Sequence, residues 1–141
     1  MNDLISVLVP TYGRPERLRA CVKSVYDTAT RPGSVEVLVR VDASDPRHKD
    51  YIKVLEGMWG ATRSWHVAQT QSYGRGIEFL RKKARGDILF AGADDVMFRT
   101  KGWDDRVRAV FGPREDGLLV AYANNGRDRE DRKSTRLNSS H

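Results

Sequence analysis

Acidic residues that follow apolar runs are the best candidates for chemistry in this chain. Asp42 follows the apolar run 35–41, and Asp94 and Asp95 come shortly after the run 88–91. Carboxylate oxygens are hard ligands that suit Mg²⁺ or Mn²⁺, and one or two of them suffice when substrate phosphates complete the coordination shell. An acidic site also needs such a cation before it can hold an anionic phosphate group. The pattern therefore indicates a possible site for a divalent cation and a phosphorylated ligand.

Each of these acidic residues also has a simpler explanation. An aspartate after a strand often caps a turn, because its side chain accepts hydrogen bonds from nearby backbone N–H groups. Thr11 and Tyr12, which follow the first apolar run, can likewise be turn and packing residues. These motifs support a binding site only if the fold brings them together.

Alternating strands and helices are the elements that would position these residues. Short β-branched or apolar runs bounded by Gly, Pro and Asp predict strands, and apolar residues at three-to-four spacing predict helices. The predicted strands are 5–9, 35–41, 64–68, 88–91 and 117–122. The predicted helices are 15–28, 49–55, 73–84 and 103–110.

This alternation predicts an α/β domain with a mainly parallel sheet and flanking helices. Ligands of such sheets collect outside the carboxyl ends of the strands. Thr11, Asp42, Asp94 and Asp95 all fall at such ends. We therefore expect three separate loops to converge on one crevice.

Three blocks of the sequence resemble the nucleotide-binding half of family-two glycosyltransferases, which have the Rossmann-like GT-A fold. The blocks are SVLVPTYGRPERLRACVKSV, VEVLVRVDASDP and ARGDILFAGADDVMF, and the resemblance covers roughly residues 4–112. The chain departs from the family motifs at three positions. Gly13 stands where Asn is usual, Val41 replaces the first Asp of the Asp-Asp-Gly-Ser loop, and Ala93 replaces the first Asp of the third block.

The resemblance implies a role for each matched residue. It places the nucleotide of a nucleoside-diphosphate sugar donor, expected to be a UDP-sugar, against Pro10, Thr11, Tyr12, Arg14, Asp42 and Asp94, with Mn²⁺ or Mg²⁺ on Asp95. Asp42 would accept a hydrogen bond from the base, and the metal would stabilise charge on the departing diphosphate. The resemblance also implies inverting transfer of a sugar to a glycan, lipid or protein acceptor. In the family the general base comes from a later segment.

The C-terminal end of the chain has a different character. Residues 131–141, DRKSTRLNSSH, back-translate to a common sequencing-library adapter read in frame, although a natural polar, disordered terminus would have the same composition. We expect residues 1–130 to be a partial GT-A domain, incomplete at the C-terminus, and inactive in transfer without the missing base. The tail carries three basic residues and one acidic residue, so it supplies +2 of the net charge of +6.

Composition and motifs weigh against other functions. A dinucleotide oxidoreductase needs a Gly-rich turn after its first strand, which PTYGRP is not. A nucleotidyltransferase remains the alternative enzyme, and a basic nucleic-acid-binding module the alternative binding protein. The basic cluster Arg75, Arg81, Lys82, Lys83 and Arg85 is either a solvated helix face or a contact for a diphosphate or an anionic surface.

A few single residues bear on the site and on location. Trp103, followed by two aspartates, either walls the donor pocket or packs in the core, and Cys21 is expected to pack. His48 and His66 have no partners at metal-ligand spacing. With one cysteine and no apolar run long enough to span a membrane, the chain is expected in the cytoplasm.

Overall fold

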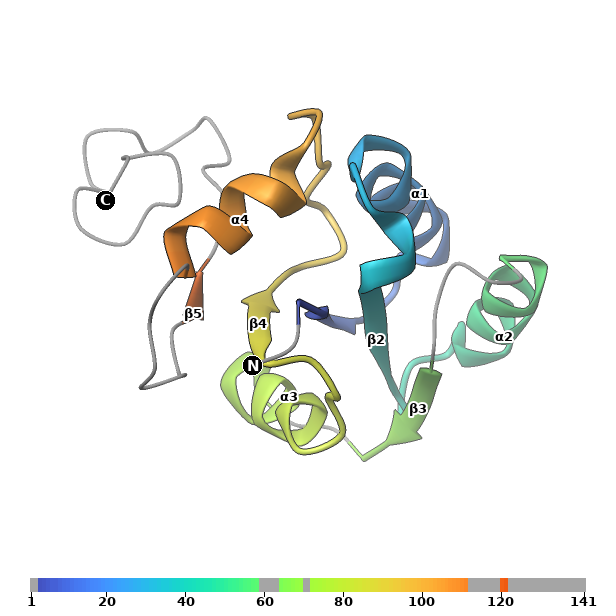
Figure 1. Cartoon of the computed structure of the whole chain (residues 1–141). Coiled ribbons are helices and arrows are strands. Elements are labelled where there is room, and N and C mark those ends of the chain that lie inside the picture. Colours follow the sequence, from blue (N-terminus) through green and yellow to red (C-terminus); the bar gives the residue numbers. More distant parts are fainter. Residues whose placement is uncertain (1–2, 59–63, 70–71, 112–119, 122–141) are drawn as a thin grey trace, which may run out of the picture.

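The chain forms one parallel sheet flanked by helices, in a computed structural model that describes residues 3–58, 64–69, 72–111 and 120–121 (Figure 1). The strands are β1 (Ile5–Thr11), β2 (Val35–Asp42), β3 (Ser64–Ala68), β4 (Ile88–Ala91) and β5 (Val120–Ala121). The helices are α1 (Pro15–Thr28), α2 (His48–Gly57), α3 (Tyr73–Arg81) and α4 (Trp103–Phe111), with a short 3-10 helix η1 (Pro32–Ser34) before β2.

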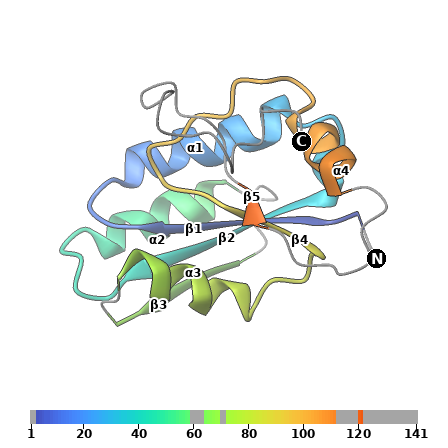
Figure 2. The same cartoon turned by 90° about the vertical axis from the view of Figure 1, so that its left-hand side faces the viewer.

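The sheet has the strand order β3-β2-β1-β4-β5, and every strand pair is parallel. The predicted mainly parallel α/β fold is therefore confirmed. Seen along the sheet, α1 lies on one side and α3 on the other (Figure 2). Because β2, β1 and β4 are parallel, the loops that follow them leave the same edge of the sheet, and because β1 lies between the other two, these loops are neighbours.

The larger core lies on the sheet face that α1, α2 and α4 cover. This face is apolar because alternate strand residues point to it, and valines of β1 and β2 supply most of its strand side chains. Its buried members include Val7, Val9, Val37, Val39, Phe90, Leu18, Val22, Tyr51 and Trp103. A smaller core of Leu8, Leu38 and Leu80 lies under α3.

The face under α3 also buries polar residues. Glu36 is 1% exposed, and its carboxylate accepts hydrogen bonds from the Ser6 hydroxyl at 2.6 Å and from the Arg85 backbone N–H at 2.8 Å. Arg40, on the same strand, is 2% exposed. The two faces of the sheet thus differ in kind, since one is an apolar core and the other contains charge.

Several element boundaries differ from the prediction, and those of β1 and α3 have a visible cause. Strand β1 continues through Pro10 to Thr11, because β2 pairs with it to that point while the pairing with β4 ends at Leu8. A proline, which lacks the N–H, is tolerated where one side of the strand has no partner. Helix α3 ends at Arg81 instead of residue 84, since the chain turns there and the Arg85 N–H bonds Glu36.

Two further predicted segments lie partly or wholly outside the described residues. Of the predicted strand 117–122, residues 120–121 form β5, and the others lie outside the described residues. The predicted tail 131–141 lies outside them as well. Among the described helices, none has the length and apolar character needed to cross a membrane.

Candidate nucleotide and metal site

The loops after β1 and β4 are joined directly at the carboxyl edge of the sheet. The Thr11 hydroxyl donates a hydrogen bond of 2.7 Å to Oδ2 of Asp94, although the two residues are 83 positions apart. Both are buried, with Thr11 5% and Asp94 7% exposed. The structure therefore brings together two residues that the sequence had placed on separate strand ends.

A chain of hydroxyl groups extends this contact to Arg14. The Thr11 Oγ1 lies 2.9 Å from the Tyr51 hydroxyl, which accepts a 2.6 Å hydrogen bond from the Arg14 backbone N–H. Since the single Thr11 hydroxyl proton goes to Asp94, Tyr51 must donate to Thr11. Burial raises the pKa of Tyr51, so the phenol keeps the proton that this arrangement requires.

Arg14 and the two aspartates form the charged centre of the site. Nη1 of Arg14 lies 3.5 Å from Asp94 Oδ1 and 3.8 Å from Asp95 Oδ2. The side chains of Arg14 and Asp95 are 51% and 41% exposed, whereas that of Asp94 is 8% exposed. Asp95 thus faces solvent beside a half-exposed cationic partner, and Asp94 is held by its hydrogen bond from Thr11.

The loop that carries the two aspartates is held from both faces of the sheet. On the α3 side the Tyr73 hydroxyl donates to the Gly92 carbonyl at 2.7 Å, and on the α1 side the Cys21 thiol lies 3.5 Å from the Ala93 carbonyl. Burial, followed by the charges of Asp94 and Asp95, raises the pKa of Cys21 to about 12. Cys21 is therefore a protonated, packed thiol, as expected.

The loop after β2 is tied to the loop after β1 through Asp45. Asp45 is 1% exposed, and its carboxylate accepts hydrogen bonds from the backbone N–H groups of Gly13 and Arg47. Gly13 has a φ of 71°, in the left-handed region that glycine and asparagine tolerate best. This explains why Gly13 can stand where the family usually has asparagine.

Asp42 is partly used by its own turn. Its Oδ1 accepts hydrogen bonds from the Ser44 N–H at 2.8 Å and the Ser44 hydroxyl at 2.7 Å, and the residue is 5% exposed. The turn-capping explanation is therefore correct as far as Oδ1 is concerned. It does not exclude a ligand, because a carboxylate can accept more hydrogen bonds than the two that Ser44 donates.

Pro10 and Tyr12 occupy different environments. A Cβ atom on Gly76 of α3 would lie 3.2 Å from the Pro10 ring, so glycine permits the close packing of this helix on β1. Tyr12 is 52% exposed. Pro10 is thus a packing residue beneath α3, and Tyr12 presents its ring to solvent.

The donor set fits a hard cation only if a ligand completes it. Within the described residues, no group of three or more His, Cys, Asp or Glu side chains could hold a metal ion. Asp94 and Asp95 offer two carboxylates, and a Mg²⁺ or Mn²⁺ site of this kind is normally completed by water and substrate phosphates.

Several residues that hold the site were missed at the level of sequence. Tyr51 and Asp45 connect loops that are more than thirty positions apart, and Tyr73 fixes the Gly92 carbonyl. The Asp-Pro pair at 45–46, directly before a helix, was the one local signal available. Tyr51 carried none, since a tyrosine on an apolar helix stripe predicts packing.

The segment that begins at Trp103 belongs to the core and not to the donor pocket. Trp103 is 4% exposed, its indole N–H donates to the Val25 carbonyl at 3.0 Å, and its ring packs against Phe90 and Phe98. Asp104 is fully buried and accepts hydrogen bonds from the backbone N–H groups of residues 30 and 31. The packing alternative for Trp103 is therefore the correct one.

Solved structures with this fold include a mannosyltransferase and the protein TarS. The mannosyltransferase PcManGT from Pyrobaculum calidifontis, solved with GDP-Man and Mn²⁺, superposes with a TM-score of 0.66 at 15% identity, over 77% of this chain and 32% of its own. S. aureus TarS superposes with a TM-score of 0.60 at 20% identity, over 77% of this chain and 19% of its own. A TarS fragment, residues 1–349 in complex with UDP, gives the same TM-score and identity, with 32% of its length covered.

The chain thus spans about a third or less of the length of these neighbours. No curated protein sequence matches it. Residues 6–138 match the family model described as glycosyl transferase family 2, which is nearly the whole chain. This match and the shared fold agree with the motifs at the strand ends, and the chain belongs to glycosyl transferase family 2.

Proposed function

We propose that this chain binds a nucleoside-diphosphate sugar, with a divalent cation, at the carboxyl ends of β1, β2 and β4 for glycosyl transfer. The observation that carries the proposal is the contact of Thr11 with Asp94, which places two carboxylates and Arg14 in one charged centre. Membership of glycosyl transferase family 2 supports it. So do the ligands of the neighbours, since one was solved with GDP-Man and Mn²⁺ and another with UDP.

In this proposal Asp95 binds Mn²⁺ or Mg²⁺, and Asp94 orients the ribose and diphosphate. When bound, the cation supplies Lewis-acid stabilisation of the charge that develops on the departing diphosphate. Arg14 now lies against both carboxylates. A cation on the carboxylates would release its guanidinium toward the phosphate oxygens, for which its donors are well suited.

Recognition of the nucleotide base is assigned to Asp42 and Tyr12. Asp42 would accept the N–H of uracil beside its contacts with Ser44, and a base that lacks this N–H could not make the bond. The exposed Tyr12 ring offers a stacking surface. We therefore propose uridine diphosphate as the nucleotide, and Pro10, Thr11 and Tyr73 as residues that hold the site in shape.

Transfer itself needs more than the residues assigned here. An inverting mechanism requires a general base to deprotonate the acceptor hydroxyl, and we propose that this base and the acceptor surface belong to sequence beyond the described site. The 141-residue chain should then bind donor but transfer sugar several orders of magnitude more slowly than a version extended with native downstream sequence. Equal turnover by the two chains would overturn this assignment of the general base.

We also propose a cytoplasmic location, which the single cysteine supports.

Calorimetric titration of the 141-residue chain with UDP tests the binding. We expect binding with Mn²⁺, much weaker binding with chelator, and weaker binding of GDP, CDP and ADP. Asp95→Asn should reduce the Mn²⁺-dependent part, while Asp27→Asn, an exposed change on α1, should not. Equal affinity with Mn²⁺ and with chelator would contradict the metal site.

A further inference from the structure

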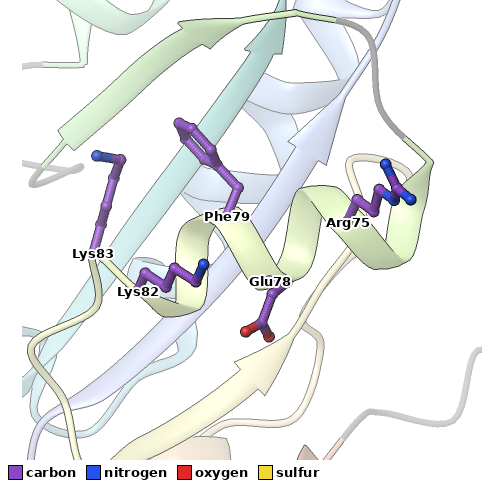
Figure 3. Close-up of a pocket in the computed structure, with 5 residues that line it drawn as sticks. All are labelled: Arg75, Glu78, Phe79, Lys82 and Lys83. Carbon is purple, nitrogen blue, oxygen red and sulfur yellow. The ribbon is translucent and has the colours of Figure 1, made fainter.

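A hollow lies along α3 and the turn that follows it, and none of its lining residues belongs to the site described above. Its volume is about 330 Å³, and it is lined by Arg75, Glu78, Phe79, Lys82 and Lys83 (Figure 3). Phe79 on the helix and Lys83 on the turn after it point to the same side, and Glu78 points to the opposite side. The volume is within the range of small-molecule sites.

The charges of the hollow are not balanced within the described part of the chain. Both carboxylate oxygens of Glu78, the acidic lining residue, are bonded to Arg81, one of them at 2.8 Å. No described carboxylate forms an ion pair with Arg75, Lys82 or Lys83. Three cationic side chains therefore line the hollow against one carboxylate, that of Glu78, which is bonded to Arg81 and is also attracted by the charge of Lys82.

A buried cation lies behind the same surface. Arg40 is 2% exposed, and its Nε and Nη2 atoms are buried without a hydrogen-bond partner among the described residues. Its guanidinium carbon lies 5.7 Å from the Phe79 ring centroid, and the Lys83 ammonium lies 5.0 Å from that centroid. Phe79 thus lines the hollow on one side and contacts the buried cation of β2.

The acidic residues nearest to Arg40 along β2 are engaged elsewhere. Glu36 holds Ser6 and Arg85, and Asp42 holds Ser44. His66, in register with Arg40 on β3, makes no hydrogen bond to it, and its own Nε2 is also buried without a partner among the described residues. A buried guanidinium without a counter-ion or full hydrogen bonding is strongly unfavourable, so this region favours an anion from outside.

We propose that this hollow binds a phosphate-bearing anion, held by Arg75, Lys82 and Lys83 and stabilised by the charge of Arg40 behind Phe79. The ligand is either a free phosphorylated molecule or the headgroup of a phospholipid, which present the same chemistry. Because the residues are cationic, binding needs no divalent metal. This distinguishes the hollow from the donor site, whose carboxylates repel phosphate unless a cation is present.

Inorganic pyrophosphate in the presence of chelator is the first probe, measured by calorimetry on the 141-residue chain at low salt. We expect saturable binding that weakens at least about tenfold in the double variant K82Q/K83Q, which removes two charge-assisted contacts. The matched control K49Q/K53Q removes the same charge from exposed positions of α2 and should bind as the unmodified chain does. Arg40→Met should weaken binding about threefold, because a charge behind the ring acts over a longer distance.

Vesicles provide the second probe and separate the two ligand sources. Co-sedimentation with phosphatidic acid in phosphatidylcholine, against phosphatidylcholine alone, should be lost in K82Q/K83Q and retained in K49Q/K53Q if the ligand is a headgroup. Pyrophosphate binding without vesicle binding identifies a free phosphorylated ligand. The proposal is overturned if neither probe binds, or if the two double variants lose binding equally. Unchanged pyrophosphate affinity in Arg40→Met would overturn the role of the buried cation.

Discussion

The acidic edge of the sheet and the cationic flank of α3 both bury charged side chains, but these differ in whether the surrounding chain hydrogen-bonds to them. Asp45 and Asp94 each accept hydrogen bonds from the loops around them. Arg40 has two buried nitrogens without a described partner. The buried carboxylates hold backbone N–H groups, at the edge of the sheet and also at Glu36 under α3, whereas the buried guanidinium of Arg40 holds no described group through these two nitrogens.

This difference separates two functions of a buried ion. A carboxylate that holds N–H and O–H groups from other loops fixes the positions of those loops before any ligand arrives, which is preorganisation. An uncompensated guanidinium fixes nothing and costs stability. The same type of substitution should therefore have opposite effects in the two regions.

The largest contrast is expected in stability. Asp45→Ala leaves the Gly13 and Arg47 N–H groups without their acceptor and should destabilise the fold by about 1–3 kcal/mol. Arg40→Met removes an unpaired buried charge and should be neutral or stabilising by about 1–4 kcal/mol. Urea unfolding midpoints, with unchanged slopes, measure both. If Arg40→Met proves the more destabilising of the two, Arg40 has a partner and the comparison fails.

Within the acidic edge, ligand affinity should separate two aspartates. Asp95→Asn should weaken Mn²⁺-dependent UDP binding by about 1–3 kcal/mol, because the metal loses a charged ligand. Asp42→Asn should have a smaller effect, since its amide oxygen can still serve the Ser44 turn. Calorimetry on folded variants gives both values. Normal binding by Asp95→Asn would show that the acidic motif has been assigned to the wrong residue.

A single hydroxyl group tests how far preorganisation of the acidic loop matters. Tyr73→Phe removes the bond to the Gly92 carbonyl and should weaken Mn²⁺-dependent UDP binding by about 0.5–1.5 kcal/mol. Tyr26→Phe is the matched control, because it also removes a hydroxyl that donates to a backbone carbonyl, that of Val35. It should lower stability without changing affinity. Equal affinity losses would mean that only general stability is being measured.

The smallest effects concern the electric fields of the two regions, which should have opposite signs. Burial and then the Asp95 charge raise the pKa of Tyr73, so Asp95→Asn should lower that pKa part of the way back. Burial and then the Lys83 charge lower the pKa of His66, so Lys83→Gln should raise it. NMR titration of the two side chains would show both directions. Shifts of the same sign in the two variants would contradict the comparison.

The sequence was sufficient to locate the strands and their acidic ends. Apolar runs that stop at Asp42 and shortly before Asp94 are local patterns, and parallel topology then requires both ends to lie at the same edge. The extension of β1 to Thr11 depended on how far its neighbours pair with it. Such pairing is a property of the assembled sheet and leaves no mark on the strand itself.

What escaped prediction were contacts between distant loops. Tyr51 and Asp45 owe their roles to partners on the loop after β1, and nothing in their own neighbourhoods indicates those partners. The basic cluster of α3 was likewise ambiguous as a sequence. The structure divides it, since Arg81 and Arg85 pair with glutamates while Lys82 and Lys83 line the hollow with Arg75.

The bond between Thr11 and Asp94 also has a consequence for folding. It closes a loop of 83 positions, and ordering a loop of that length has an entropic cost that must be met before the contact contributes anything. The proposed donor site therefore cannot exist before β1 and β4 have come together, and should be among the last parts of the chain to form. A ligand that binds across β1 and β4 then stabilises only the completed chain, by an amount that grows with the logarithm of its concentration above the dissociation constant. Binding of the proposed donor would thus raise the free energy of global unfolding of the whole chain.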